Sequence, residues 1–494
     1  MFGKKKFQKK TIGNIPSYKS YTDMLRPSRK RSILKILLIV GCIFIVFYMS
    51  KYVISFVQGT FSQIAKGTVN IISNSVGDAM TGDEFGNINV MIVGYGGEGH
   101  AGSYLADSIM VASFNPKLGA VTMISVPRDL YVYDTGRGIV GRINEVFSVG
   151  VGGKHAFATG AELLSNMLEN IMGLKINYYA LVDFQGFKGL IDTLGGITVN
   201  VPESFVDTTY PTTDNGYMTV SFTSGVNQFD GETALEYARS RHSTSDFSRS
   251  LRQQLIIKAI MDKLISKGLL NITRIKKLYA DYTNIVKTNI SLKEIMGMVK
   301  YIYRLKHMFS YGFTTECSNL NYKYSSPGCF LYTPSRDLFN GASIMIPDGA
   351  SPGNVGFYDY TQNFVFYVAH NQEYLIENPK IVVMNGVDKT FAKQTFGKSE
   401  GFANQLAVKL KKYAFNIVDV SNFSQPISGT AIYILSTGDV SKTIETLKNF
   451  VPVTDIVENG LGSGFDQLSG VDLVLVLGND YIPHLANNPF SYYK

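Results

Sequence analysis

The sequence predicts an α/β protein whose main sheet is covered by helices on both faces, with a smaller C-terminal α/β domain and one N-terminal transmembrane helix. Apolar runs of strand character alternate with stretches of helical spacing between residues 88 and 308, as in sheets that carry helices on both faces. A second alternation of this kind fills residues 379–481, which is a normal domain size. A charge-free apolar stretch near the N-terminus follows a strongly basic arm.

The composition indicates a globular protein and argues against nucleic acid as a partner. Hydrophobic residues make up 45% of the 494 residues and charged residues 17%, which is enough apolar material for a substantial core. The net charge of +8 comes from residues 1–31, whose ten Lys and Arg and one Asp give +9, so the remaining 463 residues sum to −1. A nucleic-acid-binding domain needs a basic face of its own.

The N-terminal region is predicted to anchor the chain in the cell membrane with a single pass. Residues 33–57 are long enough to cross a bilayer if Lys35 and Lys51 extend toward water. Positive residues lie only before this stretch, so the arm, residues 1–32, is expected in the cytoplasm and the bulk of the chain outside. A cleaved signal peptide is the alternative. The long arm and the absence of a small-residue cleavage site after Ser50 favour a retained anchor, with residues 58–86 as a stalk.

The main domain is predicted over residues 87–345. Asp230 is expected to cap one helix through Tyr237, and Ser248 a longer one to about Ser266. The other expected strands are 89–93, 108–114, 121–126 and 197–201, and the other expected helices are 161–172, 185–194 and 292–308.

A Gly/Pro-rich stretch at residues 348–354 marks a boundary, so residues 346–378 are predicted to be a connecting segment and residues 379–494 a separate α/β domain. In that domain the expected strands are 381–384, 416–420, 430–435 and 471–477, and the expected helices are 392–412 and 441–449. Outside the predicted membrane helix, which contains Cys42, the cysteines are Cys317 and Cys329. A disulfide between them and two free thiols are both open.

The most informative segment is a run of four arginines within fourteen positions: Arg239, Arg241, Arg249 and Arg252. Apolar residues flank the run, so it belongs to folded elements, and Asp246 and Gln253 lie within it. The planar guanidinium fork suits phosphate oxygens, which favours a pocket for a polyphosphate group. Arg249, Arg252 and Gln253 share one face of the expected helix, near its anion-favouring N-terminus. A solvated basic helix with local ion pairs is the alternative.

A glycine-rich loop precedes a candidate metal ligand. Residues 94–99 contain G-x-G-x-x-G after a strand, but no helix opens at the third glycine and no acidic residue follows where a ribose would bind. The loop therefore predicts a border of a phosphate pocket rather than a dinucleotide site. Asp107, with Glu98 and His100 upstream, offers oxygen ligands for a magnesium ion that also binds phosphate. A turn cap is the alternative for Asp107.

Two further cations stand near predicted strand ends. Arg128 follows the strand that ends at Val126, and Asp129 can orient it. Arg142 and Asn144 would share a face if both lie on a strand. Surface ion pairs are the alternative for each arginine. A Walker A lysine motif is absent from the sequence.

Taken in order and spacing, these motifs resemble the LytR-CpsA-Psr family over roughly residues 87–265. The most specific is Tyr-Ala-Arg-Ser-Arg at 237–241, followed by Asp246, Arg249 and Arg252-Gln253-Gln254. Residues 379–481 resemble the C-terminal domain that is often attached to this family. The other matching segments are 107–108, 125–129, 142–144, 179–184 and 194–199.

The resemblance implies a bacterial phosphotransferase on the outer face of the membrane, which moves a glycopolymer from a polyprenyl pyrophosphate carrier onto cell-wall peptidoglycan. It implies an α/β/α sandwich with a central mixed sheet, a hydrophobic tunnel for the lipid, and Mg²⁺ (or Mn²⁺) bound between an aspartate and the pyrophosphate. The implied metal ligand is Asp107. The implied pyrophosphate ligands are Arg128, Arg142 (a lysine in many members), Asn144, Arg239, Arg241, Asp246, Arg249, Arg252 and Gln253.

The chain departs from the family pattern at Tyr95-Gly96, where many members have an Asp that helps bind the metal, and at Leu105, where many have an Arg. Glu98 or His100 is then a candidate for the second metal ligand. Either Asp129 or Asp246 is the candidate general base. A non-catalytic scaffold that holds the lipid pyrophosphate or wall polymer is the alternative function. A membrane-bound transcription regulator is disfavoured because the cytoplasmic arm is too short for a helix-turn-helix domain.

Overall fold

The computed structural model describes residues 79–487 except 101, 135–137, 213–215, 241–245, 267–274, 277–278, 281–285, 318–320, 459–464 and 466–467. All described residues belong to one compact unit. The predicted cytoplasmic arm, the predicted transmembrane helix and most of the predicted stalk lie outside this range. Within it, every helix is too short or too polar to cross a bilayer.

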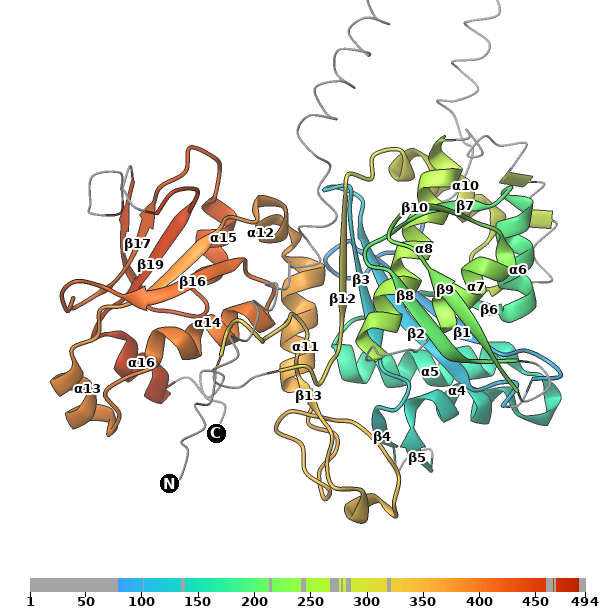
Figure 1. The fold of residues 1–494 in the computed structure, drawn as a ribbon, viewed down its shortest axis with the longest axis horizontal. Coiled ribbons are helices and arrows are strands. Elements are labelled where there is room, and N and C mark those ends of the chain that lie inside the picture. Colours follow the sequence, from blue (N-terminus) through green and yellow to red (C-terminus); the bar gives the residue numbers. More distant parts are fainter. Residues whose placement is uncertain are drawn as a thin grey trace, which may run out of the picture. The chain divides into compact units, whose positions relative to one another are not determined.

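The main sheet has six strands in the order β11-β6-β1-β2-β3-β12 (Figure 1). Strand β1 pairs antiparallel with β2 and parallel with β6, and β3 pairs antiparallel with β2 and parallel with β12. This confirms an α/β fold with a central mixed sheet. The strands are β1 (Ile88–Tyr95), β2 (Ala106–Asn115), β3 (Ala120–Val126), β6 (Tyr178–Asp183), β11 (Val286–Thr288) and β12 (His307–Gly312).

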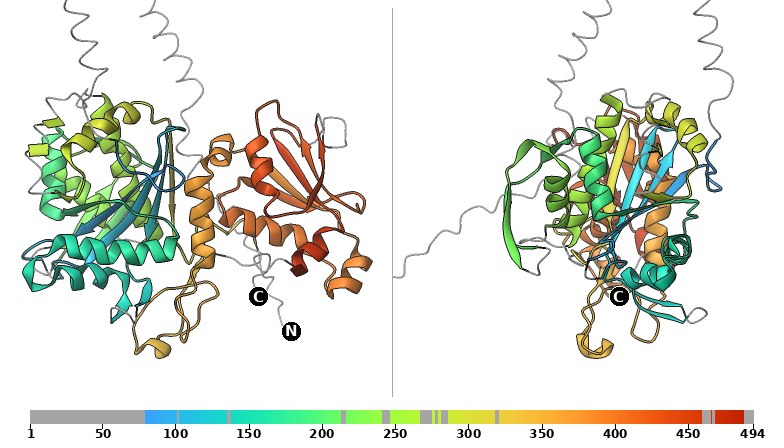
Figure 2. Two further views of the ribbon diagram at one scale, coloured as in Figure 1. Left: turned by 180° about the vertical axis from the view of Figure 1, so that it is seen from behind. Right: turned by 90° about the vertical axis from the view of Figure 1, so that its right-hand side faces the viewer.

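Helices cover both faces of this sheet (Figure 2). In β2, Ile109 and Val111 face one core, and Met110 and Phe114 face the other, as the two-residue period of a strand requires. The first core includes α4 (Ile143–Val151), α5 (Phe157–Met172) and α11 (Asp359–Val365), and α8 (Asp246–Ser266) and α10 (Leu292–Ile302) pack against the second. Each fully buried side chain of this kind stabilises the fold by roughly 1.5–3 kcal/mol.

Smaller elements complete the main domain. The segment between α6 and α8 builds two small two-stranded sheets, β7 with β10 and β8 with β9. The elements are β4 (Tyr131–Asp134), β5 (Ile139–Arg142), η1 (Gly152–Lys154), α6 (Phe184–Thr193), β7 (Ile197–Val201), β8 (Phe205–Pro211), β9 (Tyr217–Phe222), β10 (Gly225–Phe229), α7 (Gly231–Arg239), β13 (Leu331–Tyr332), η2 (Arg336–Phe339) and β14 (Ile346–Pro347).

Several predicted helix boundaries differ from the structure, and two of the differences have a clear physical cause. The Asp230 cap is confirmed, since its carboxylate accepts a hydrogen bond from the Thr233 backbone N–H at 2.8 Å. The Ser248 cap is wrong, because α8 already begins at Asp246. The helix predicted over 292–308 ends at Ile302, because residues 307–312 pair with β3 as a strand.

The C-terminal strands form a second sheet in the order β16-β15-β19-β17-β18. The helix predicted over residues 392–412 is two helices, because Gly397 and Gly401 adopt left-handed φ angles of 74° and 86° between them. The elements are β15 (Ile381–Asn385), α13 (Lys389–Phe396), α14 (Phe402–Lys412), β16 (Ile417–Asn422), β17 (Thr430–Ile434), α15 (Ser441–Leu447), β18 (Val453–Val457), β19 (Leu473–Leu477) and α16 (Tyr481–Asn487).

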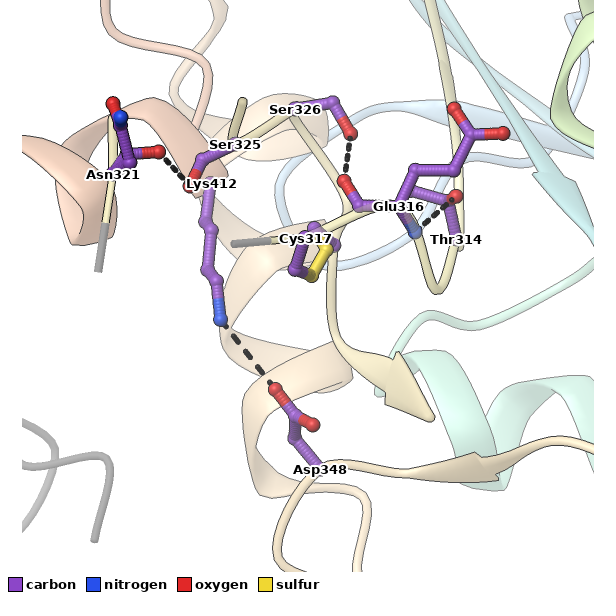
Figure 3. Close-up of a disulfide and its surroundings, with 9 residues drawn as sticks. Thr314, Glu316, Cys317, Asn321, Ser325, Ser326, Asp348 and Lys412 are labelled. Carbon is purple, nitrogen blue, oxygen red and sulfur yellow. Dashed lines mark hydrogen bonds and ion pairs between the residues drawn. A yellow bond between two sulfur atoms is a disulfide. The ribbon is translucent and has the colours of Figure 1, made fainter. Parts of the chain in front are cut away.

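The predicted connecting segment carries α11, η3 (Phe366–His370) and α12 (Gln372–Glu377), and it packs on the main sheet. The Thr122 hydroxyl donates to the Val368 carbonyl at 2.6 Å, and the Gln372 amide donates to the Thr122 hydroxyl at 2.9 Å. Between β12 and this segment, Cys317 and Cys329 form a disulfide with a Cα–Cα distance of 5.7 Å (Figure 3). The sequence alone is compatible with either a disulfide or two free thiols, and the structure has the disulfide.

Candidate active site

Two groups of charged side chains are attached to the start of β2, one through Asp107 and the other through Ser108. The first begins with Asp107, at the start of β2. Strand pairing sets Ile109 opposite Val126, so the antiparallel register brings Asp107 level with Arg128. Arg128 Nη1 accordingly donates to Asp107 Oδ1 at 2.6 Å.

Asp129 links this ion pair to a second arginine. Its Oδ2 lies 3.7 Å from Arg128 Nε, and its Oδ1 lies 3.4 Å from Arg142 Nε. The four side chains from Asp107 to Arg142 therefore alternate in charge. Their exposed fractions range from 23% to 37%, so a charged ligand can reach them. Both Nε groups are buried and make no hydrogen bond to a described residue.

Asn144 lies beside this first group, although not as the sequence predicted. The prediction that Arg142 and Asn144 share a strand is wrong, because β5 ends at Arg142 and Asn144 belongs to α4. The Asn144 backbone N–H donates to the Arg128 carbonyl at 3.2 Å, which attaches the first turn of α4 to the arginine loop. The buried Asn144 Oδ1 has no hydrogen-bond partner among the described residues.

The second group is carried by α7 and α8. Arg239 ends α7, and its Cζ lies 4.4 Å from the centroid of the Phe184 ring and 5.3 Å from that of Tyr210. Arg239 Nη1 also donates to the Tyr210 hydroxyl at 3.2 Å. Burial raises the pKa of Tyr210, and the Arg239 charge opposes that shift, so the phenol is neutral at physiological pH.

Arg252 and Gln253 bind the end of α7. Arg252 Nε donates to the Tyr237 carbonyl at 3.1 Å and its Nη2 to the Ser240 carbonyl. Its Cζ lies 4.9 Å from the centroid of the Phe205 ring. Gln253 Nε2 donates to the Ala238 carbonyl at 3.3 Å. These side chains satisfy carbonyls that a helix C-terminus leaves without partners.

A single dipeptide joins the two groups. While Asp107 pairs with Arg128, the adjacent Ser108 donates through its hydroxyl to Gln253 Oε1 at 2.7 Å. Most of the predicted site residues that the structure describes therefore belong to one of these two groups. Arg249 is buried on α8, one turn before Gln253. Arg241 lies outside the described residues, and of Asp246 only the backbone is described.

The glycine-rich loop lies next to the end of β6. Gly97 has a left-handed φ of 86°, and a Cβ there would lie 3.0 Å from the Asp183 Cβ, so both backbone conformation and space favour glycine. Glu98 is exposed on this loop, without a hydrogen bond or ion pair to a described residue. Phe184 and Tyr210 were not predicted as site residues. Phe184 falls inside a matching segment of the family resemblance, whereas no sequence pattern marks Tyr210.

The oxygen atoms near Asp107 fit a magnesium ion whose remaining ligands are phosphate oxygens and water. Among the described residues, no group of three or more His, Cys, Asp and Glu could hold a metal by itself. Mg²⁺ commonly uses one or two carboxylates together with phosphate oxygens and water. Asp107 supplies one carboxylate, and the unpartnered Asn144 Oδ1 is a further oxygen beside the same loop.

The sequence model described as the LytR_cpsA_psr family matches residues 54–323, more than half of the chain. The protein belongs to the LytR-CpsA-Psr family. Among the relatives of this LytR-CpsA-Psr protein is TagU of Bacillus licheniformis, a polyisoprenyl-teichoic acid–peptidoglycan teichoic acid transferase, with 31% identity over 192 residues. That match covers 38% of this chain and 56% of the relative.

TagV of Bacillus subtilis, which carries the same functional description, is 30% identical over 243 residues, covering 48% of this chain and 58% of the relative. The LytR-CpsA-Psr chain therefore spans little more than half the length of these curated relatives. Its structure aligns with the crystal structure of B. subtilis TagV at 25% identity and a TM-score of 0.42, covering 57% of this chain and 97% of that one.

Proposed function

We propose that this protein is a glycopolymer transferase that moves its substrate from a polyprenyl pyrophosphate carrier to peptidoglycan outside the cell membrane. The observation that carries the proposal is the attachment of both arginine groups to the start of β2, through the adjacent residues Asp107 and Ser108. The named activities of TagU and TagV support the two substrate classes. The predicted helix 33–57 would hold the chain in the membrane, with the N-terminus in the cytoplasm.

In this proposal the arginines bind the diphosphate. An acceptor hydroxyl attacks the phosphorus that carries the glycopolymer, the bond to the bridging oxygen breaks, and polyprenyl phosphate leaves. The hydroxyl proton passes to a carboxylate, Asp129 or Asp246. Guanidinium donors that already point at the phosphates stabilise the charge that develops on them. With water in place of the hydroxyl, the same site would act as a pyrophosphatase.

Asp107 would hold Mg²⁺ or Mn²⁺ together with the substrate phosphates, with Asn144 or Glu98 as further oxygen ligands. The ion would neutralise phosphate charge when bound. Because Asp107 is paired with Arg128, its carboxylate must be shared between the guanidinium and the metal. Arg128, Arg142, Arg239, Arg241 and Arg249 remain the proposed pyrophosphate-binding set. The prediction that Arg252 and Gln253 bind pyrophosphate is not kept, because their side chains bind carbonyls of α7.

The test uses the full-length protein in detergent with polyprenyl-pyrophosphate-linked glycan, peptidoglycan fragments and Mg²⁺. Mass spectrometry measures released polyprenyl phosphate and glycan-linked fragments. Arg128→Ala and Arg239→Ala should each lower turnover by about 100-fold or more, as expected for a group that stabilises transition-state charge. Arg336→Ala, at an exposed arginine of η2, is the matched control. Full activity of both site variants would overturn the proposal.

A non-catalytic scaffold is the second candidate function. It is favoured by the small number of acidic ligands around Asp107, which is already engaged by Arg128. Tight binding of the lipid-linked glycan, with neither transfer nor hydrolysis in Mg²⁺ or Mn²⁺, would select the scaffold over the enzyme.

A further inference from the structure

Three elements far apart in the sequence converge on the guanidinium of Arg239. Phe184 is the first residue of α6, Tyr210 belongs to β8, and Arg239 is the last residue of α7. The two ring centroids lie 4.4 Å and 5.3 Å from Arg239 Cζ, within the range of cation–π contacts. Only one of the five guanidinium N–H groups is given to the Tyr210 hydroxyl.

A β-bulge turns Tyr210 toward Arg239. The pairing of β8 with β9 shifts register between Asp207 and Tyr210. Both of these side chains are buried, and Thr208 and Thr209 between them are exposed. Regular alternation would put positions 207 and 210 on opposite faces, so the extra residue of the bulge reverses the direction of Tyr210. The Thr209 N–H and hydroxyl both donate to Asp207 Oδ1, at 3.0 and 3.1 Å, which stabilises the bulge.

Phe184 is also fixed from two sides. The preceding Asp183 caps α6 by accepting a hydrogen bond from the Gly186 N–H at 2.7 Å, which sets the position of the first helical residue. The His100 ring packs edge-on against Phe184 with a centroid distance of 5.1 Å. Phe184 therefore lies between the glycine-rich loop and Arg239.

We propose that Phe184 and Tyr210 are positioning residues that clamp the Arg239 guanidinium, through two ring contacts and one hydrogen bond, and leave its other N–H groups for the substrate diphosphate. This inference rests on the proposed function, because it assigns Arg239 to the diphosphate. An arginine that already contacts two rings loses little freedom when an anion arrives, whereas an arginine without such contacts must be ordered at that moment. The clamp should therefore matter for diphosphate affinity and turnover more than for folding.

The experiment measures inorganic pyrophosphate affinity and transfer kinetics for Phe184→Leu, Tyr210→Leu and Tyr210→Phe in the full-length protein. The two leucine variants should weaken pyrophosphate binding and kcat/KM by about threefold to thirtyfold, the range of a cation–π contact. Tyr210→Phe keeps the ring and should lose less than Tyr210→Leu. Phe229→Leu is the control, since Phe229 is buried against Phe222 and Tyr237 in the neighbouring aromatic cluster.

Each variant is repeated with Arg239→Lys, whose ammonium cannot stack as a plane. In that background, Phe184→Leu should have little further effect if the clamp acts through Arg239. Equal losses in both backgrounds, or clamp variants as active as Phe229→Leu, would overturn the inference. Wild-type protein that neither binds nor turns over its substrates would instead overturn the proposed function. Tyr210→Phe decides the outcome if a leucine variant does not fold.

Discussion

The Ser108 hydroxyl donates to Gln253 Oε1 at 2.7 Å, across 145 residues of sequence. This bond holds the start of β2 against the second turn of α8. Because Asp107 pairs with Arg128 at 2.6 Å, adjacent residues fasten both charged groups to the same strand. The spacing of the two groups is therefore set by the backbone of β2.

Ser108→Ala should remove this connection without disturbing the sheet. The loss of one partly buried hydrogen bond is expected to lower the free energy of unfolding by about 1 kcal/mol, and diphosphate affinity should fall several-fold. Urea unfolding and pyrophosphate titration measure the two effects. Ser266→Ala, which removes an exposed hydrogen bond at the end of α8, is the control. Unchanged diphosphate affinity in Ser108→Ala would show that the two groups act separately.

Asp107→Asn should uncouple activity from the divalent metal. The amide keeps the shape of the side chain but loses the charge that Mg²⁺ prefers, so turnover should fall at least about 100-fold. Activity measured against Mg²⁺ and Mn²⁺ concentration checks this, and EDTA should abolish wild-type turnover. Asp262→Asn, at an exposed carboxylate paired with Lys258, is the matched control. A wild-type metal response in Asp107→Asn would assign the ion to other residues.

Reduction of the Cys317–Cys329 disulfide should destabilise the protein. The closed loop is attached to α14 by the Gly328 N–H, which donates to the Lys412 carbonyl at 3.0 Å. Opening a loop of this size is expected to cost about 2–4 kcal/mol. Urea unfolding of the Cys317→Ala/Cys329→Ala double variant measures the effect, with Cys42→Ser as the control. Equal stability of the double variant and the control would contradict this expectation.

Lys409 should make stability depend on alkaline pH. Burial lowers its pKa to about 8 from 10.5, so between these values the unfolded chain binds more protons than the folded one. The free energy of unfolding should therefore rise with pH from 8 to 10.5, and the full cost of burying the charge applies below about pH 8.

Lys409→Met should remove its own part of this slope and stabilise the protein at pH 7 by up to about 3 kcal/mol. A smaller slope should remain, because burial also lowers the pKa of Lys411 and Lys412. Urea unfolding at several pH values measures both effects. Lys448→Met, at an exposed lysine that follows α15, is the control. If the free energy of unfolding of Lys409→Met rises with pH as steeply as that of the wild type, the pH dependence belongs to another group.

The family and eight of the nineteen strands that the structure describes could be predicted because they depend on short stretches of sequence. The Asp230 cap involves a backbone N–H only three residues away, so it is visible in the local pattern. Strands β1, β2, β3 and β7 were predicted from apolar runs that are fully or half buried, which gives them a recognisable composition. The arginine run likewise predicted a charged site because its residues lie close together in the sequence.

The remaining features needed the tertiary structure, because they come from partners far away in the sequence. Residues 307 and 308, which were predicted to end a helix, belong to a strand because residues 307–312 pair with β3. Arg252 is directed to the carbonyls of α7 only once the two helices pack together. Tyr210 faces Arg239 because of a bulge, which the two-residue period of a strand does not encode. The sequence alone predicted which cations and carboxylates belong to the site, and packing determined which of the described ones meet, because hydrogen bonds and ion pairs depend on distances that only the folded backbone sets.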